Sequence, residues 1–262
     1  MQNSKTACLP AGRELSVIIV NYRSEQYLKN CVASLFKYLH NITFEIIVVN
    51  NDNNILEVEA HCNASLRADV NIQIINHHKN IGFGAACNLG AELVRGEILW
   101  FLNPDTEILS ASLEKIVDKL KNSDKVAVIG PRLITAANKT QQWCAGKESS
   151  LWRNIKNNFG IVESKKVWES EFSVLADWVS GAALFVKKEV FERVGGFDEN
   201  FFMYFEDEDL CRRIRLAGYD VLYYPAVSIR HLVGQSREGL LKQKMQFYRS
   251  LVYFFKKAKK NG

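Results

Sequence analysis

The segment Leu102-Asn103-Pro104-Asp105-Thr106-Glu107 places a carboxylate just after a strongly apolar run, Ile98–Leu102. Hard cations such as Mg²⁺ and Mn²⁺ prefer oxygen ligands, and they often take one or two carboxylates together with phosphate oxygens. The Asp105 carboxylate could therefore hold a divalent cation on a diphosphate. Asn-Pro-Asp is also favourable turn chemistry, so a simple turn is the competing interpretation.

A second acidic segment, Glu206-Asp207-Glu208-Asp209, begins a predicted helix. Acidic residues suit the positive end of a helix dipole, so capping is one explanation. Four adjacent carboxylates also repel one another, which favours a metal, a sugar hydroxyl or a cationic partner opposite them. The preceding residues, 195–204, are rich in aromatic side chains, which suit either sugar rings or core packing.

A third segment, Asn80-Ile81-Gly82-Phe83-Gly84-Ala85-Ala86-Cys87-Asn88, has two glycines where a helix is expected to begin. The amino terminus of a helix attracts phosphate. The segment is neither a Walker loop nor a complete G-x-G-x-x-G motif, so close helix packing explains the glycines equally well.

These segments are positioned by an alternation of strands and helices. Apolar, β-branched runs predict strands at 15–20, 45–49, 71–75, 98–102 and 126–129, and helical periodicity predicts helices at 28–39, 84–95 and 110–121. Such alternation predicts an α/β fold with a parallel sheet between helices. Ligands of such sheets bind beyond the carboxyl ends of the strands, so the loops after Val20, Val49 and Leu102 are expected to converge.

The second half of the sequence is less regular. We expect a loop-rich insertion at 135–176, a strand at 182–186, and a helix at 206–217 that Gly218 ends. A final strand is predicted at 221–224, before Pro225.

Composition is that of a soluble globular protein, with 47% hydrophobic and 24% charged residues in a chain of 262. No apolar run reaches the roughly 18 residues of a membrane span, and 1–14 resemble a polar leader rather than a signal peptide. The expected location is the cytoplasm. The six cysteines are scattered, which argues against a zinc site or a disulfide scaffold.

The carboxyl end, 236–262, carries an apolar stripe at helical spacing among many lysines and arginines. The stripe consists of Leu241, Met245, Tyr248, Val252 and Phe255. A basic amphipathic helix can lie on an anionic membrane surface, which predicts a peripheral location on the inner face of the cytoplasmic membrane. The alternative is a helix that packs on the core of the protein and ends in a solvated basic tail.

Together the motifs G-F-G-A-A-C-N-L-G, F-L-N-P-D-T-E, W-V-S-G-A, G-G-F-D-E-N-F-F-M-Y-F-E-D-E-D-L-C-R-R and R-H resemble the family 2 glycosyltransferases. They occur in consistent order from about Leu15 to His231. The most similar subgroup is the rhamnosyltransferase-like enzymes of bacterial O-antigen and other surface polysaccharides, including lipopolysaccharide.

The resemblance implies a GT-A fold: a Rossmann-like, mostly parallel central sheet flanked by helices, with an amphipathic helical extension. It implies a catalytic domain at 15–235, in which 15–130 bind the nucleotide sugar and 131–235 bind the acceptor.

The resemblance also implies the catalytic roles. Asp105 is the expected ligand of a divalent cation, Mg²⁺ or Mn²⁺, and His231 is a further expected ligand. Asp207 resembles the catalytic base of the family, and Glu206 is expected to assist it. Asn103 stands where the metal motif of the family has its first acid.

Donor and acceptor residues follow from the same match. The expected donor-binding residues are Val20, Asn21, Tyr22, Asn50, Asp52, Gly82, Phe83, Gly84, Asn88 and Asn103. The expected acceptor-binding residues are Trp178, Gly181, Tyr204 and Asp209. The family usually has an aspartate where this chain has Asn50, so either the Asn50 amide or the Asp52 carboxylate contacts the nucleoside.

The implied reaction is metal-dependent and inverting. It transfers a sugar, first of all L-rhamnose from dTDP-rhamnose, to a hydroxyl of a glycan acceptor linked to polyprenyl diphosphate. A UDP donor of galactose, glucose or N-acetylglucosamine is the alternative. A pyrophosphorylase is disfavoured because Asn21-Tyr22-Arg23-Ser24 is not a glycine-rich basic loop, and a non-catalytic glycan-binding protein would not need a general base.

Overall fold

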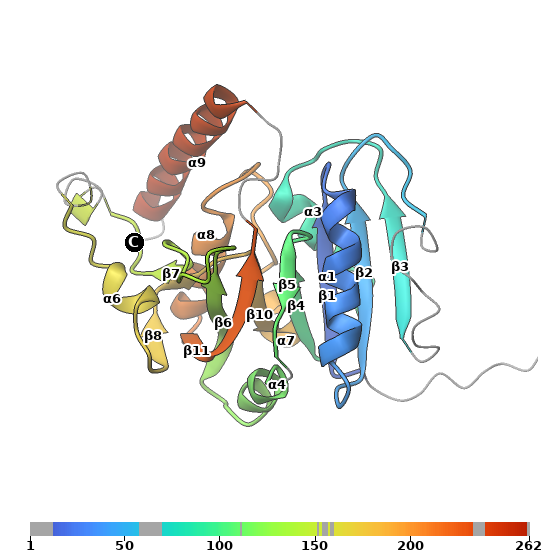
Figure 1. The fold of residues 1–262 in the computed structure, drawn as a ribbon. Helices are drawn as coiled ribbons and strands as arrows, with labels where there is room; N and C mark the ends of the chain where they lie inside the picture. The colour runs from blue at the N-terminus through green and yellow to red at the C-terminus, as the bar shows by residue number, and fades with distance from the viewer. Residues whose placement is uncertain are drawn as a thin grey trace, which may run out of the picture.

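The computed structural model describes residues 13–57, 70–110, 112–150, 152–153, 157, 160–232 and 239–260. Four parallel strands form one half of the main sheet: β1 (Leu15–Asn21), β2 (Phe44–Asn50), β3 (Asn71–Asn76) and β4 (Ile98–Leu102). They lie in the order β3-β2-β1-β4 (Figure 1). β1, β2 and β4 are buried along their whole length, as their continuous apolar runs predict.

The sheet continues through strands from later in the chain. β10 (Ala183–Lys187) runs antiparallel between β4 and β6 (Val126–Ile134), and β11 (Asp220–His231) follows parallel to β6. Two short strands, β5 (Thr106–Ile108) and β8 (Val174–Ala176), pair antiparallel with β11. The described residues therefore form a nine-stranded, mostly parallel sheet.

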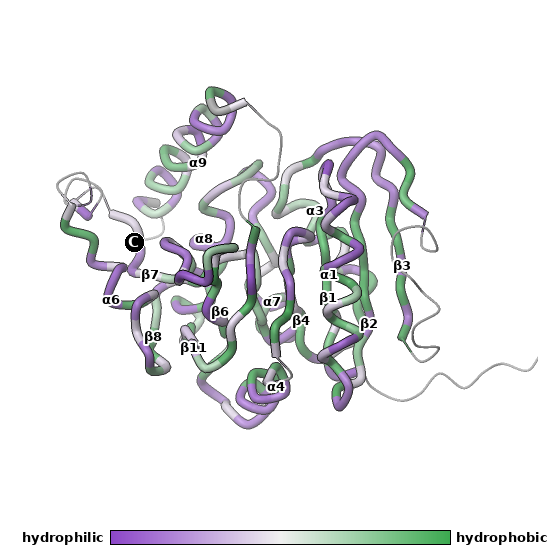
Figure 2. Tube along the Cα trace, viewed as in Figure 1, coloured by the Kyte–Doolittle hydropathy of each residue, from purple (hydrophilic) through white to green (hydrophobic). Residues whose placement is uncertain are grey.

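Helices cover both faces of this sheet. In Figure 1, α1 (Glu25–Tyr38) and α4 (Glu114–Lys121) lie in front of it, whereas α7 (Lys188–Arg193) and α8 (Glu206–Leu216) lie behind. α3 (Phe83–Ala91) packs on β1 and β2. The hydropathy colouring of Figure 2 follows this arrangement, because the central strands are the most continuously hydrophobic segments. The predicted α/β fold is confirmed.

Several predicted boundaries needed correction. β11 continues through Pro225 instead of ending before it, because a register shift against β6 between Tyr224 and Ser228 accommodates the missing N–H. α3 ends at Ala91 rather than near Arg95, and α4 begins at Glu114 rather than near Ser110. The predicted end of α8 is confirmed: Gly218 has φ +93° and donates its N–H to Arg215 O.

The segment 135–176 is poor in regular structure, as predicted. Its described residues contain β7 (Ala145–Gly146), α6 (Lys165–Trp168) and β8. β7 pairs with β9 (Trp178–Val179) in a separate two-stranded sheet. The proposed leader lies almost wholly outside the described residues.

The last helix, α9 (Leu240–Lys260), packs across the molecule beside α8. Phe254 is only 1% exposed and contacts the Phe205 ring, and Ser250 donates a hydrogen bond to Met203 O. Within the part of the chain that the structure describes, no helix is both long and apolar enough to cross a bilayer.

Candidate active site

The loop after β4 forms a turn that brings Asp105 against the end of β11. Thr106 N donates to Asn103 O at 3.3 Å, and β5 then pairs with β11 so that Thr106 lies opposite His231. His231 Nε2 lies 3.2 Å from Asp105 Oδ1, and Leu232 N donates to Asp105 O. The turn and the metal interpretations are therefore compatible, because the turn presents the carboxylate to the imidazole.

The tautomer of His231 follows from its neighbours. Its Nδ1 lies 2.8 Å from Gln141 Oε1, an acceptor, so Nδ1 carries the proton. In the neutral form of the ring Nε2 keeps a lone pair, toward which Asn103 Nδ2 points from 3.2 Å. This lone pair beside the Asp105 carboxylate suits a divalent cation. Among the described residues no three His, Cys, Asp or Glu side chains gather as a metal site, so such a cation would also need diphosphate oxygens.

The acidic segment begins α8 from a strained backbone. Tyr204 and Phe205 both have φ near +70°, which is uncommon for bulky residues. Such strain persists where the surrounding structure imposes it, and it concentrates at functional sites. Gly181 N donates to Asp207 Oδ2 at 2.9 Å, and Glu208 N donates to Asp207 Oδ1 at 2.8 Å. Both oxygens of Asp207 are therefore held in place.

Glu206 and Asp207 differ in their surroundings. Burial raises the pKa of Asp207, but the hydrogen bonds from Gly181 and Glu208 favour its charged form. Burial and then the negative charge of Asp207 raise the pKa of Glu206 to about 8. Glu206 is 6% exposed, and its Oε2 has no hydrogen-bond partner in the described structure. These surroundings favour the proton on Glu206 and the negative charge on Asp207.

The other two acids of the segment are engaged in packing. Glu208 accepts hydrogen bonds from Ser149 N and Oγ, and burial raises its pKa to about 8. Asp209 is 2% exposed and pairs with Arg213 at 2.7 Å and with Lys257 of α9 at 2.8 Å. The structure thus directs the Asp209 carboxylate toward Arg213 and toward Lys257 of α9.

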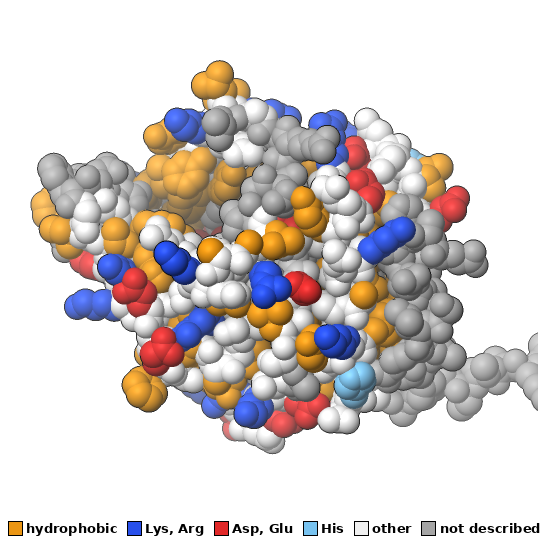
Figure 3. Space-filling model, in the orientation of Figure 1, with side chains coloured by type: hydrophobic (Ala, Val, Ile, Leu, Met, Phe, Trp, Pro, Cys, Tyr) orange, Lys and Arg blue, Asp and Glu red, His pale blue; other side chains and the backbone are white. Residues whose placement is uncertain are grey.

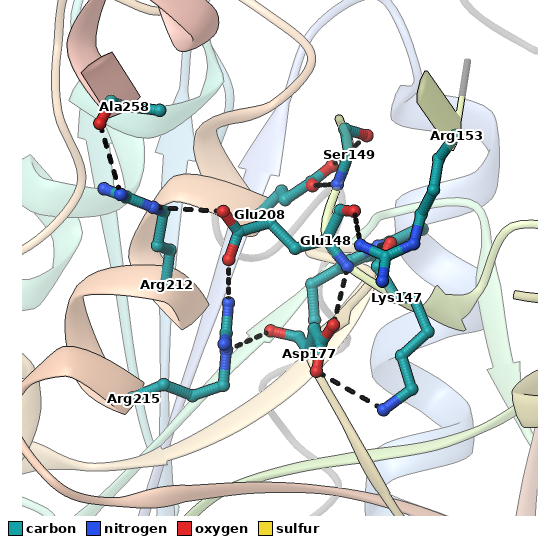
Figure 4. A network of polar contacts seen from close by, with 10 residues as sticks. Lys147, Glu148, Ser149, Arg153, Asp177, Glu208, Arg212, Arg215 and Ala258 are labelled. Carbon is teal, nitrogen blue, oxygen red and sulfur yellow. Dashed lines mark hydrogen bonds and ion pairs between the residues drawn. The ribbon is translucent and has the colours of Figure 1, made fainter. Parts of the chain in front are cut away.

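A network of ion pairs attaches the segment after β7 to α8 (Figure 4). The Glu148 carboxylate pairs with Arg212 at 3.1 Å and also with Arg215. The backbone of the same residue donates its N–H to Asp177 Oδ2 and accepts from Arg153 Nη1. This segment forms a wall of the cavity described next, so the network fixes that wall to the helix that carries Asp207.

A cavity of about 720 Å³ opens in front of Asp207. The predicted site residues that line it are Phe83, Asn103, Trp178, Gly181, Tyr204, Glu206, Asp207 and His231. Figure 3 shows a hollow beneath α9 with hydrophobic side chains inside it. The cavity therefore unites the Asn103–His231 corner, against which Asp105 lies, with the carboxylates of α8.

The glycine segment before α3 is closely packed. A Cβ on Gly82 would lie 2.6 Å from Phe202 O, and one on Gly84 would lie 3.1 Å from Phe197 Cβ. Asn88 donates to Phe197 O and accepts from Phe197 N, so its amide holds the loop before α8. Close packing thus accounts for both glycines, and it joins α3 to the second half of the chain.

Three asparagines form a ladder at the carboxyl ends of β1, β2 and β3. Asn21, Asn50 and Asn76 lie in register. Asn21 Nδ2 donates to Asn50 Oδ1 at 3.1 Å, and Asn50 Nδ2 donates to Asn76 Oδ1 at 2.9 Å. Asn50 is fully buried, whereas the Asp52 side chain remains 15% exposed near Arg23. Of the two alternatives for the nucleoside, Asp52 is the accessible one.

The remaining predicted residues lie outside the cavity lining, as the described structure places it. They are Val20, Asn21, Tyr22, Asn50, Asp52, Gly82, Gly84, Asn88, Asp105 and Asp209. Sequence reasoning missed Gln141, Trp143 and the α9 residues Phe247, Tyr248 and Leu251, which do line it. The apolar stripe on α9 indicated that this helix contacts something besides solvent. No local sequence pattern indicated Gln141, because its partner His231 lies 90 residues later.

Solved structures share this architecture. The mannosyltransferase PcManGT of Pyrobaculum calidifontis, solved with GDP-Man and Mn²⁺, has a TM-score of 0.64 at 17% identity, covering 96% of this chain and 65% of that one. S. aureus TarS 1–349 has a TM-score of 0.60 at 15% identity, covering 84% of this chain and 60% of that one. The fold is the GT-A fold of glycosyltransferases.

The family model described as glycosyl transferase family 2 matches residues 16–173, and that of glycosyl transferase family group 2 matches 98–257. This chain belongs to glycosyl transferase family 2.

Curated relatives are similar over most of this chain. Agl10 of Haloferax volcanii, a low-salt glycan biosynthesis hexosyltransferase, is 28% identical over 79% of this chain, which spans 64% of that protein. The N-acetylglucosaminyl-diphospho-decaprenol L-rhamnosyltransferase of Mycobacterium tuberculosis is 26% identical, over 83% of this chain and 75% of its own length. Rhamnosyltransferase WbbL of Escherichia coli is 28% identical, over 82% of both chains.

Proposed function

We propose that this protein is an inverting glycosyltransferase that moves a sugar from a nucleoside-diphosphate donor to a hydroxyl of a glycan acceptor. The observation that carries the proposal is a single cavity lined both by Asp207 and by the Asn103–His231 corner that abuts Asp105. Asp207 accepts the proton of the acceptor hydroxyl as that oxygen attacks the anomeric carbon. Attack opposite the leaving diphosphate inverts the configuration at that carbon.

Asp105 and His231 would hold a divalent cation, Mg²⁺ or Mn²⁺, with Asn103 beside them. When bound, such a cation neutralises charge that develops on the departing diphosphate. The remaining contribution of the chain is positional: Gly181 N and Glu208 N donate to the two oxygens of Asp207, which favours the negative charge on Asp207 rather than on the buried Glu206.

For the donor we propose dTDP-L-rhamnose, with Asp52 at the nucleoside. Its support is the similarity to the two rhamnosyltransferases. A UDP sugar is the second candidate, supported by the related structure of TarS with UDP-GlcNAc.

A thermal-shift panel of dTDP and UDP sugars, with and without Mn²⁺, tests both candidates, because a ligand that binds only the native state raises the Tm. We expect the largest rise with dTDP-rhamnose plus metal, and a smaller rise in Asp52→Ala. A panel in which no nucleotide sugar raises the Tm contradicts the proposed function. A response to UDP sugars alone replaces the first donor by the second.

For the acceptor we propose a polyprenyl-diphosphate-linked glycan reached at the membrane surface. The outward stripe of α9, formed by Leu241, Met245, Tyr248 and Val252, is 51–81% exposed. Exposed basic residues flank it, including Lys242, Lys244, Arg249, Lys256 and Lys259. Tyr248 also lines the cavity, so the stripe is continuous with the cavity mouth. An apolar stripe among basic side chains suits an anionic membrane.

Co-sedimentation with vesicles tests this membrane contact. The protein should bind phosphatidylglycerol-containing vesicles at low salt, and the double variant Met245→Glu, Val252→Glu should not. Phe172→Glu is the matched control, because Phe172 is 80% exposed outside α9. Equal binding by the double variant, or no binding by the native protein, would remove the membrane from the proposal.

A further inference from the structure

Trp143 presents a large aromatic ring to the cavity from a strained backbone. Its side chain lines the cavity and is 43% exposed. Its φ is +59°, a region that bulky residues rarely adopt. The next two residues, Cys144 and Ala145, are buried at 1% and 0% exposure. A tryptophan held exposed and strained beside buried backbone requires an explanation beyond packing.

The ring is braced from the protein side. Its centroid lies 4.9 Å from that of Trp168, at an interplanar angle of 54°. Trp168 is 4% exposed, and its carbonyl accepts a hydrogen bond from Tyr223 OH. Gln141, two residues earlier, is hydrogen-bonded to His231 at the Asn103–His231 corner. The indole is thus supported by a buried ring on its protein side.

Backbone contacts place Trp143 on the same wall as the catalytic base. Ser180 N donates to Cys144 O at 2.9 Å, and the following residue, Gly181, donates to Asp207. Trp143 follows β6 in the chain. In the sheet, β4 and β10 lie between β6 and the strands β1, β2 and β3. A ligand on the indole therefore lies toward Asp207 and away from the expected nucleotide edge.

We propose that Trp143 is the platform on which the acceptor sugar stacks, an inference that rests on the proposed function. The C–H groups of a pyranose face are apolar and carry slight positive charge, which complements the negative face of an indole. Stacking there would orient one sugar hydroxyl toward Asp207 and exclude water from the stacked face. The strain at Trp143 is the cost of presenting the ring.

The variant Trp143→Gly tests this platform without threatening the fold. Glycine adopts φ +59° freely, so the variant should keep its Tm close to that of the native protein while losing the ring. Trp143→Phe keeps a smaller ring. Trp152→Ala is the control, because Trp152 is 67% exposed and does not line the cavity in the described structure.

Two measurements apply to each variant. Saturation-transfer NMR with methyl glycosides of rhamnose, glucose, galactose and N-acetylglucosamine should show contact with the native protein and with Trp152→Ala, less with Trp143→Phe, and none with Trp143→Gly. With an alkyl-diphosphate-linked N-acetylglucosamine as acceptor, Trp143→Gly should raise the acceptor KM by about tenfold or more and leave the donor KM unchanged.

The outcomes separate the two proposals. Unchanged sugar contact and unchanged acceptor KM in Trp143→Gly, or no contact of any methyl glycoside with the native protein, overturn the platform. If methyl glycosides contact the native protein through Trp143 but no nucleotide sugar raises the Tm, the platform stands and the proposed function is contradicted. A rise in donor KM alone would also overturn the assignment, because it would place the ring at the donor.

Discussion

At the scale of single residues, two adjacent carboxyl groups differ in the hydrogen bonds that they receive. Glu206 and Asp207 follow one another at the start of α8, yet only Asp207 receives hydrogen bonds on both oxygens. Glu206 keeps a buried oxygen without a partner. Adjacent carboxyl groups whose surroundings separate their pKa values are typical of acid–base sites.

Replacement of Asp207, the proposed base, tests this difference between the two carboxyl groups. Asp207→Asn keeps the shape of the side chain but cannot take a proton, so kcat should fall by about a hundredfold or more while donor binding persists. Turnover and donor-induced thermal shifts measure the two effects. Glu169→Gln is the control, because that carboxylate is 55% exposed and lies outside the cavity lining. Near-normal turnover by Asp207→Asn would exclude Asp207 as the base.

Gln141 offers a second test at this scale. Its Oε1 accepts a hydrogen bond from His231 Nδ1, which orients Nε2 toward Asp105. Loss of such a supporting hydrogen bond commonly weakens metal affinity about 10- to 100-fold. Titration calorimetry with Mn²⁺ should show this loss in Gln141→Ala and not in Gln142→Ala. Equal affinities in both variants would mean that His231 does not need Gln141 or is not a ligand.

At the scale of elements, α9 packs on the core with one face and exposes an apolar stripe on the other. One face carries Phe254, Ser250 and Lys257 onto the core, and the other carries the exposed apolar stripe. The interpretation of the tail as a helix that packs on the protein is confirmed, and the membrane interpretation stays a prediction that the exposed stripe supports. Periodicity predicted the helix, but it could not assign the inward face, which depends on Asp198 and Asp209 far earlier in the chain.

Lys257 attaches this helix to the active-site half. Its Nζ lies 2.6 Å from Asp198 Oδ2 and 2.8 Å from Asp209 Oδ1. Burial opposes ionisation of Asp198, but hydrogen bonds from Lys257 and Asn200 lower its pKa to about 2. Lys257→Met would leave the Asp198 and Asp209 carboxylates without this cation.

We expect Lys257→Met to destabilise the protein by about 2 kcal/mol, because it removes charge-assisted hydrogen bonds to two partly or fully buried carboxylates. Urea unfolding measures the loss. Lys256→Met is the control, because Lys256 is exposed on the same helix. If the two variants unfold at the same urea concentration, α9 is not secured by this ion pair.

At the scale of the whole molecule, buried acids make stability depend on pH. The pKa of Glu206 is raised from 4.5 to about 8, so between these values the folded protein binds a proton that the unfolded chain has lost. Stability must then decrease as pH rises through this window. Glu208, whose pKa is also raised to about 8, acts in the same direction.

Glu206→Gln removes one of the groups that bind a proton in the folded state and lose it in the unfolded state. Relative to the native protein, the variant should be more stable at pH 8 than at pH 5, as urea unfolding of the unligated proteins at both pH values would show. A difference between the proteins that is the same at both pH values would mean that Glu206 is ionised in the fold.

The sequence predicted the parallel core well because β1, β2 and β4 are continuous apolar runs whose burial is decided locally. It did not predict the insertion of β10 between β4 and β6, which depends on pairing across some 80 residues, such as Trp100 stacked on Phe185 at 4.4 Å. The same limit applies to the site: Asp105 and Asp207 were found by motif, whereas Gln141 and Trp143 have meaning only through residues distant in sequence.

The interleaving of β10 has a consequence for how the chain can be divided. Residues 15–130 were expected to form a donor half and residues 131–235 an acceptor half. In the described sheet, however, β4 and most of β6 belong to the donor half, and β10 of the acceptor half lies between them. A fragment cut near residue 130 would leave both of these strands with unpaired edges. Neither piece should fold by itself, and a split enzyme should regain its structure only when both pieces are refolded together.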